Sequence, residues 1–247
     1  MRLDIINKLK KLAVCSSNVV WRRGLYHRVG AAIEHDAFFK HFDFRTIVDI
    51  GANTGQFSLV MRKNFPQADI YSFEPLQKPF KRFVKLFEND RNVKAFNNAI
   101  GPYVTDTEIN VSARDDSSSV LPISDLQNQI FPGTAAVRTE KILMGPLNDY
   151  LREDEIKGPS LLKLDVQGFE LDALKGCQEF LRRFDMVYCE CSFVELYVGQ
   201  AFASEVISYM SGSNFRLEGC NNVAYDHEGK TVQADCIFIN NLSGEQE

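Results

Sequence analysis

The sequence predicts an α/β fold built on a doubly wound, mostly parallel seven-stranded sheet, with an antiparallel last strand and helices on both faces. Short apolar runs, typical of strands buried on both faces, alternate with amphipathic helical segments along most of the chain. Polar residues directly follow several of these runs, at the strand ends where such sheets bind ligands. At 247 residues, the chain is long enough for one enzyme-sized domain.

Residues 1–45 are expected to form an N-terminal helical extension, and the main domain is expected to span 46–247. The extension has helical patterns over 3–14 and about 19–40. The simpler interpretation is that it packs on the domain as a helix layer; the alternative is that it caps the binding site or meets a partner. The histidines show no spacing typical of a metal site, and we expect them to be surface or packing residues: His27, His35, His41 and His227.

Residues 46–55, TIVDIGANTG, run from a β-branched strand into an acid and a turn with two glycines. Glycines allow a sharp turn where a ligand comes close, and we expect Gly51 to approach the ligand too closely for a side chain. The second strand, 68–73, ends at Glu74, where an acid can accept hydrogen bonds from ribose hydroxyls. We therefore predict a nucleoside-bearing ligand, and this region contributes Asp49, Gly51, Asn53, Gly55, Phe57, Glu74 and Pro75 to the predicted site.

The spacing of the glycines favours S-adenosylmethionine over NAD. A dinucleotide fingerprint has a central glycine where this chain has Asn53, and that glycine normally lets the backbone approach a pyrophosphate. Asp49 would repel a pyrophosphate but suits a cationic amine. S-adenosylmethionine has a ribose, an α-amino group and no phosphate, so we expect it as the cofactor.

The next elements are predicted from their periodicity. Helix 56–64 follows the turn. Helix 78–88 is expected to face the core with an apolar stripe formed by Phe80, Phe83, Val84 and Phe87. Strand 93–96 leads to Asn98 and Ala99, which we add to the cofactor-binding residues. Alternation of polar and apolar residues between 101 and 160 predicts antiparallel strands.

The last part of the chain supplies the remaining strands. Strand 161–166 contains Lys163 and Asp165 and is followed by a helix from Glu170 through Leu181. Strand 186–191 has Glu190 near its carboxyl end. The final strands are predicted at 215–219 and 235–240, with a turn near 227–229, and antiparallel pairing at this end of the sheet is expected.

Five segments together resemble the FkbM-type methyltransferases: VDIGANTG (48–55), FEP (73–75), NAIG (98–101), KLDVQGFE (163–170) and QADCIF (233–238). The resemblance covers roughly residues 45–240. It implies a class I, Rossmann-like fold that uses S-adenosylmethionine and, usually, O-methylation of a hydroxyl on a sugar, glycan or other secondary metabolite. It leaves the identity of this acceptor open.

Methylation of a hydroxyl needs help with its proton, and two carboxylates are candidates for the base. Asp165 and Glu190 end neighbouring strands, and a carboxylate there can act as a general base. Lys163 completes the predicted catalytic residues, and Asp165 is also counted as a cofactor contact. Asp165 and Glu190 could instead hold Mg²⁺, but with only two oxygen ligands we place that alternative second and predict no metal site.

Two other functions stay open from sequence alone: an NAD-dependent oxidoreductase and a non-catalytic protein of the same fold that still binds the cofactor.

The net charge of −5 argues against nucleic acid as a partner. The six cysteines show neither metal nor disulfide-framework spacing, and we expect reduced thiols. Lysines interrupt the only apolar run near the start, so we expect no signal peptide, no membrane span and a cytoplasmic protein. The oligomeric state is not predicted.

Overall fold

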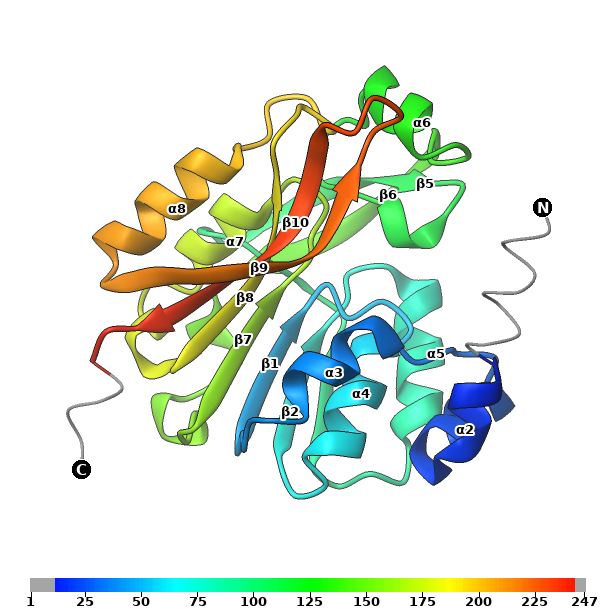
Figure 1. Ribbon diagram of the computed structural model, residues 1–247, viewed down its shortest axis with the longest axis vertical. Coiled ribbons are helices and arrows are strands. Elements are labelled where there is room, and N and C mark those ends of the chain that lie inside the picture. Colours follow the sequence, from blue (N-terminus) through cyan, green and yellow to red (C-terminus); the bar gives the residue numbers. More distant parts are fainter. Residues whose placement is uncertain (1–11, 243–247) are drawn as a thin grey trace.

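The computed structural model describes residues 12–242, and its core is one seven-stranded sheet of order β3-β2-β1-β7-β8-β10-β9 (Figure 1). The pairs β2–β3, β1–β2, β1–β7 and β7–β8 are parallel, whereas β10 is antiparallel to both its neighbours. The predicted sheet with its antiparallel last strand is thus confirmed. The strands are β1 (Thr46–Ile50), β2 (Asp69–Phe73), β3 (Val93–Phe96), β7 (Ser160–Leu164), β8 (Met186–Ser192), β9 (Phe215–Tyr225) and β10 (Thr231–Asn240).

Helices cover both faces of this sheet. One face carries α2 (Val19–Tyr26), α3 (Asp36–Phe39), α4 (Gln56–Asn64) and α5 (Gln77–Phe87), and the other carries α7 (Glu170–Gly176) and α8 (Ala203–Gly212) (Figure 1). Short 3₁₀ turns lie at Ile33–His35, Asp115–Ser117, Leu147–Asp149, Glu153–Glu155 and Leu181–Arg183. Within residues 12–242, no helix is both long and apolar enough to cross a membrane.

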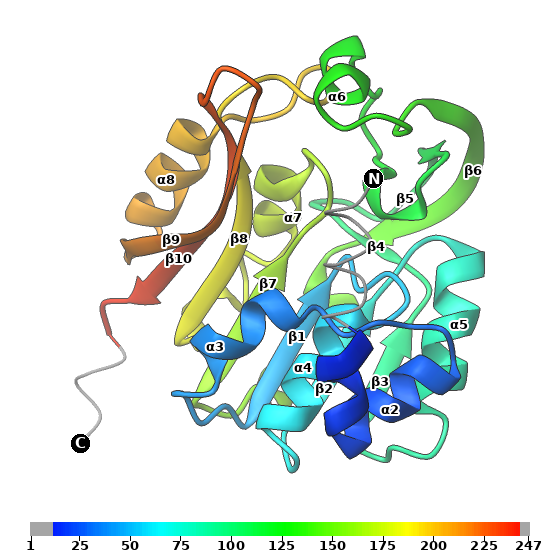
Figure 2. The ribbon, with the colours of Figure 1, turned by 45° about the vertical axis from the view of Figure 1, so that its right-hand side comes forward.

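A second, three-stranded sheet lies beyond the carboxyl ends of the main strands. It consists of β4 (Ala99–Ile100), β5 (Thr105–Ser112) and β6 (Ala136–Gly145) in the order β4-β6-β5, with α6 (Asp125–Ile130) beside it. Both Figure 1 and Figure 2 show these elements over the end of the sheet to which β1 and β7 point. β5 and β6 are antiparallel, as predicted for this part of the chain.

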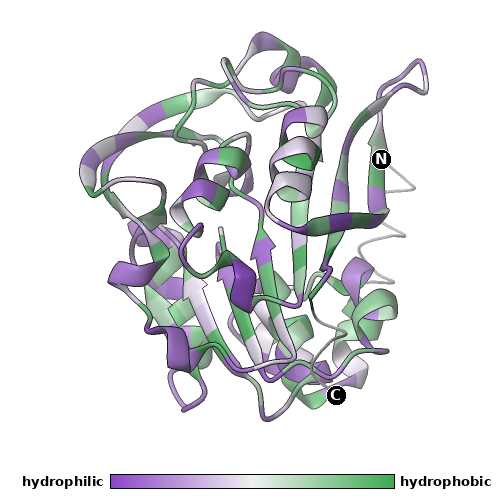
Figure 3. Ribbon diagram, turned by 90° about the vertical axis from the view of Figure 1, so that its left-hand side faces the viewer, coloured by the Kyte–Doolittle hydropathy of each residue, from purple (hydrophilic) through white to green (hydrophobic). Residues whose placement is uncertain are grey.

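The core consists of two layers, one on each face of the main sheet. All five residues of β1 and of β7 are buried, as their apolar sequences predict for central strands. Figure 3 shows hydrophobic residues along the central strands, while the helices mix hydrophobic and hydrophilic positions. The carboxyl ends of the central strands are therefore held on rigid elements.

The N-terminal region departs from the prediction of one helix over 19–40. α2 ends at Tyr26, and Arg28 adopts a left-handed conformation with φ of 59°. The chain then folds back, so that Val29, Ala31 and Ala32 are buried, and helical structure resumes only at Ile33. Burial of this apolar turn outweighs continuation of the helix. Residues 12–17 are helical, so the predicted helix 3–14 extends three residues beyond its expected end, and residues 3–11 of that prediction lie outside the described residues.

Other boundaries also differ from prediction. α7 ends at Gly176 and does not continue to Leu181 as predicted; only a 3₁₀ turn follows at Leu181–Arg183. Val84 is 43% exposed, so the predicted inward stripe of α5 was wrong at that position. β9 and β10 are longer than predicted and form a hairpin around 226–230.

Candidate active site

A cavity of about 440 Å³ opens at the carboxyl ends of β1, β2, β7 and β8. This volume lies in the range of small-molecule sites, and the position is the one expected for a doubly wound sheet. Ten of the residues predicted for the site line it, namely Gly51, Asn53, Phe57, Glu74, Pro75, Asn98, Ala99, Lys163, Asp165 and Glu190. Residues far apart in the sequence are thus brought together as predicted.

Two predicted cofactor residues do not line this cavity. Asp49 is fully buried and accepts a hydrogen bond of 2.8 Å from the Ser58 hydroxyl on α4, so the expectation that it meets a cationic amine of the ligand was wrong. Gly55 turns toward α5, where an added Cβ would lie 2.8 Å from the Phe87 ring. Its φ of 98° shapes the turn at the start of α4.

Gly51 is required for a different reason than predicted. A Cβ at this position would lie 1.8 Å from the carbonyl oxygen of Asp165, and φ is 81°. The close approach is therefore between the first turn and the end of β7, two backbone segments that form the cavity floor. Packing within the protein, not contact with a ligand, excludes a side chain here.

The turn offers no open backbone donor for a phosphate. The N–H groups of Gly51 and Ala52 donate to the Phe73 carbonyl, and that of Gly55 donates to Ala52. The other two donate to side chains: Asn53 N–H to Glu74, and Thr54 N–H to the Asn53 amide oxygen at 2.6 Å. These five N–H groups are therefore not available to a pyrophosphate, which would have to bind the first N–H groups of α4 instead. The turn itself gives no support to NAD.

Glu74 is almost completely buried at the cavity edge, with 6% of its surface exposed. Its two carboxylate oxygens accept 2.8 Å hydrogen bonds from the N–H groups of Asn53 and Leu76. Burial raises the pKa of Glu74 to about 7, although both hydrogen bonds act in the opposite direction. Each oxygen has a further lone pair, so this acid can still accept from a ligand hydroxyl.

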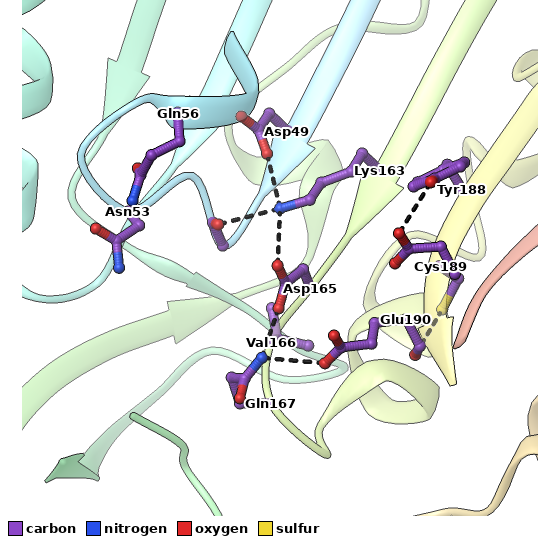
Figure 4. Close-up of polar contacts among 12 residues, drawn as sticks. Asp49, Asn53, Gln56, Lys163, Asp165, Val166, Gln167, Tyr188, Cys189 and Glu190 are labelled. Atoms are coloured by element: carbon purple, nitrogen blue, oxygen red, sulfur yellow. Dashed lines mark hydrogen bonds and ion pairs between the residues drawn. The ribbon is translucent and has the colours of Figure 1, made fainter. Parts of the chain in front are cut away.

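Lys163 forms the centre of a buried ion-pair group below the cavity (Figure 4). Its Nζ lies 3.2 Å from Asp49 Oδ1 and 3.6 Å from Asp165 Oδ2, and it donates to the Gly51 carbonyl at 3.2 Å. Burial opposes its charge, but the carboxylates of Asp49 and Asp165 prevail and raise the pKa of Lys163. Asp165 is the open member of this group, with 40% of its side chain exposed.

Gln167 links the two acids predicted as catalytic. Its Nε2 donates to Asp165 Oδ1 at 2.7 Å and to Glu190 Oε2 at 3.0 Å, as Figure 4 shows. The other oxygen of Glu190 accepts from Gln233 at 2.6 Å. Burial, and then the neighbouring carboxylates, raise the pKa of Glu190 well above its usual value. Glu170 lies outside the cavity and accepts from the N–H groups that follow β7, so it holds this loop.

The cavity is also lined by polar residues that were not predicted for it, among them His35, Tyr188, Asn222 and Asp235. His35 packs edge-on against the rings of Phe57 and Tyr188, as predicted for a packing residue, and it also lines the cavity. Tyr188 is two residues before Glu190 on β8, and Asp235 pairs with Glu190 across to β10, so strand periodicity could have indicated both. No sequence signal placed residues 35 and 222 here.

The N-terminal extension both packs on the domain and reaches the cavity. Trp21 and Phe39 belong to the apolar layer under α4, which agrees with the simpler interpretation. Ala32, Glu34 and His35 also line the cavity, so this segment forms one of its walls. Among residues 12–242, no group of three or more His, Cys, Asp or Glu side chains is arranged to hold a metal ion.

The strand order with antiparallel β10, together with a cavity beside the glycine turn and the acid of β2, defines a class I, Rossmann-like methyltransferase architecture. The family model described as "Methyltransferase FkbM domain" matches residues 49–217. The chain belongs to this family.

Two relatives show the extent of the similarity. Methyltransferase 1 of Beauveria bassiana is 30% identical over 145 residues, which is 54% of this chain and 58% of the relative. The 2-O-methyltransferase NoeI of Sinorhizobium fredii is 29% identical over 170 residues, 62% of this chain and 66% of the relative. The chain thus spans less than two thirds of the length of either relative.

Similar solved structures include a precorrin-6Y C5,15-methyltransferase of Geobacter metallireducens, with a TM-score of 0.43, 13% identity and 80% of each chain covered. Another is the fibrillarin of Aeropyrum pernix with S-adenosyl-L-methionine, with a TM-score of 0.42 and 11% identity over 83% of this chain and 73% of that one. The fold assignment rests on the strand order of this chain, not on these similarities.

Proposed function

We propose that the protein transfers a methyl group from S-adenosylmethionine to a hydroxyl of a sugar, glycan or secondary metabolite. The observation that carries this proposal is Glu74, an acid at the end of β2, placed at a cavity whose glycine turn has no backbone donor left for a phosphate. This combination suits a ribose without a pyrophosphate. Family membership supports methyl transfer as the reaction.

The residues present fit the cofactor by their chemistry. Glu74 would accept hydrogen bonds from the ribose hydroxyls. Asp165, the open carboxylate of the ion-pair group, would lie near the sulfonium, a charge that S-adenosylhomocysteine lacks. Pro75, Asn98 and Ala99 line the cavity beside Glu74 and would meet the remainder of the nucleoside. When bound, the cofactor supplies a methyl group activated by a sulfonium.

The protein contributes mainly by positioning the acceptor. Holding two reactants in line can lower a barrier by about 7–11 kcal/mol relative to free reactants. Lys163 fixes Asp165 at the cavity floor, and Gln167 ties Asp165 to Glu190, so both acids have defined positions next to the space for the acceptor. That either acid serves as a general base stays a prediction, as does Mg²⁺ between them.

The hydroxyl acceptor is the finer part of the proposal. NoeI is named a 2-O-methyltransferase, and we extend oxygen methylation to this chain on that similarity. The cavity walls offer carboxylate and amide groups that hydrogen-bond hydroxyls, among them Glu190, Gln167 and Asn222.

A methyl-transfer assay tests the proposal. The purified protein is incubated with S-adenosylmethionine labelled in its methyl group and a panel of free sugars, oligosaccharides and hydroxylated metabolites, and products are identified by mass spectrometry. We expect a labelled methyl ether and an equal amount of S-adenosylhomocysteine. Binding of the cofactor without transfer would favour a non-catalytic protein, and NAD-dependent oxidation of a panel member would favour the oxidoreductase.

A further inference from the structure

We propose that His35 accepts the proton of the acceptor hydroxyl, and that Tyr188 and Asp235 position its imidazole. This inference rests on the proposed methyl transfer. His35, Asn222 and Asp235 all lie outside the stretch 49–217 that matches the family model, and yet they line the same cavity. The flanking segments of the chain therefore contribute polar residues to the cavity wall.

His35 lies next to the ion-pair group at the cavity floor. Its ring is 5.3 Å from the Phe57 ring, centroid to centroid, in an edge-on arrangement, and Lys163 Nζ lies 5.5 Å from the centroid of the same Phe57 ring. The charges that bear on the imidazole are those of Asp235, Glu34, Lys163 and Asp165. His35 and Lys163 thus both lie against the same aromatic side chain.

The hydrogen bonds around Nδ1 define one edge of the imidazole. The Tyr188 hydroxyl lies 3.1 Å from Nδ1 and donates its only proton to Asp235 Oδ2 at 2.9 Å. When Asn222 gives its two hydrogens to Asp235 and to the tyrosine oxygen, Nδ1 carries a hydrogen and donates it to that oxygen. Asn222 donates to Asp235 at 2.7 Å and to the same tyrosine oxygen at 3.2 Å.

The other edge of the ring is then free to act. With Nδ1 protonated, a neutral imidazole has a lone pair on Nε2, and no hydrogen bond joins Nε2 to any residue within the described part of the chain. Burial lowers the pKa of His35, although Asp235 acts against it, and this shift favours the neutral ring. Asp235 Oδ2 lies 3.8 Å from Nδ1 and would stabilise the imidazolium once formed.

The carboxylates are less suited to take this proton. Asp165 is engaged by Lys163 and Gln167, and both oxygens of Glu190 accept from glutamine amides. In the proposed step, the acceptor oxygen forms a bond to the methyl carbon as the carbon–sulfur bond breaks. The electron pair of that bond stays on sulfur, the hydroxyl proton moves to Nε2 of His35, and the positive charge passes from the sulfonium to the imidazolium.

The tautomer of His35 tests this proposal without an acceptor. Two-bond ¹H–¹⁵N spectra of ¹⁵N-histidine-labelled protein, saturated with S-adenosylhomocysteine near pH 7.5, would be assigned by the loss of signals in His35→Gln. We expect a neutral ring with the proton on Nδ1, and a weaker preference for that tautomer in Tyr188→Phe. Two results would overturn the proposal. One is a proton on Nε2, which would mean that Asn222 Nδ2, 3.1 Å away, donates to an unprotonated Nδ1. The other is an imidazolium at this pH.

Kinetics with an acceptor from the sugar panel give the second test. His35→Gln should lower kcat by about 10²–10⁴-fold, leave S-adenosylhomocysteine affinity unchanged and remove the acid limb of the kcat–pH profile. The exposed His41→Gln is the matched control. Imidazole in solution should partly restore activity to His35→Ala. Wild-type kcat in a folded His35→Gln would overturn the inference and leave methyl transfer standing. Absence of transfer by the wild type would contradict the proposed function, on which the inference rests, and the tautomer result would then describe only the state of the His35 ring.

Discussion

Glu74 accepts a 2.8 Å hydrogen bond from the backbone N–H of Asn53, which joins the end of β2 to the turn that follows β1. The acid proposed to bind the ribose is therefore also a structural support of the glycine turn. Removing its negative charge should therefore weaken both the binding of the ligand and the hydrogen bond that supports the turn.

Replacement of Glu74 by glutamine should weaken S-adenosylhomocysteine binding about tenfold or more. The amide keeps the shape but loses charge-assisted hydrogen bonds worth roughly 1.5–3 kcal/mol each. Calorimetric titration of the folded variant measures this loss, and Glu88→Gln at the exposed end of α5 is the control. Equal affinities of Glu74→Gln and wild type would remove Glu74 from the cofactor site.

Affinity for S-adenosylhomocysteine should rise as the pH increases through about 7. Burial raises the pKa of Glu74 to that value, and only the ionised acid accepts from both ribose hydroxyls. The titration is repeated between pH 5.5 and 8.5 on wild type and Glu74→Gln. A pH dependence that persists unchanged in the variant would assign the titration to another group.

The free energy of unfolding without ligand should change in the opposite direction. The folded pKa of Glu74, about 7, exceeds the unfolded value of 4.5, so its contribution to stability is complete below pH 4.5 and is lost as the pH rises through about 7. Glu170, with a pKa raised to about 7 by burial, adds to the same trend. Urea unfolding of Glu74→Gln and Glu170→Gln against pH should show a flatter curve for each variant than for wild type.

Gly51→Ala should destabilise the protein far more than Gly133→Ala. Both glycines have positive φ, 81° and 88°, and an alanine pays about 1–2 kcal/mol for that conformation. Only at Gly51 does the added carbon meet a backbone oxygen, because Gly133 has no atom within 4 Å of the added carbon. We expect a loss above about 4 kcal/mol at Gly51 in denaturant unfolding. Similar losses at the two positions would show that the turn can move away from Asp165.

Lys163→Met should lower the free energy of unfolding by about 3–5 kcal/mol, because Asp49 would keep a buried charge without its partner. The matched control is Lys94→Met, which breaks the more exposed Lys94–Glu155 pair and should cost at most about 1 kcal/mol. If Lys163→Met is no less stable than the control, Asp49 does not depend on this ion pair.

Asp165→Asn should spare S-adenosylhomocysteine affinity and lower turnover by about 10²-fold or more, because the open carboxylate lies at the reacting end of the proposed site. Activity in EDTA, and after Mg²⁺ is restored, shows whether the acid instead holds a metal: activity that EDTA leaves intact supports a direct role. Turnover at the wild-type level in Asp165→Asn would leave it as a structural residue of the loop.

Much of the fold could be predicted because central parallel strands are continuous apolar runs. β1, β2 and β7 were recognised from such runs to within two residues at either end, and the polar positions that follow them meet in one cavity, since parallel strands end at a common edge. The break after α2 could not be predicted, because it depends on how Val29 and Ala32 pack onto the sheet layer.

The side-chain environment was harder to predict than the strand ends. Asp49 belongs to the expected motif, yet strand geometry turns its side chain toward Ser58 and away from the cavity. Gly51 is constrained by Asp165, more than a hundred residues later, a contact that only the folded sheet reveals. His35 reaches the cavity through a chain reversal that no local pattern indicates.

Parallel calorimetric titrations of the wild-type protein with S-adenosylhomocysteine and with NAD test the central claim most directly. The cavity beside Glu74, with every N–H of residues 51–55 already bonded, predicts saturable one-site binding of S-adenosylhomocysteine and no detectable binding of NAD. Saturable binding of NAD, with none of S-adenosylhomocysteine, would contradict it.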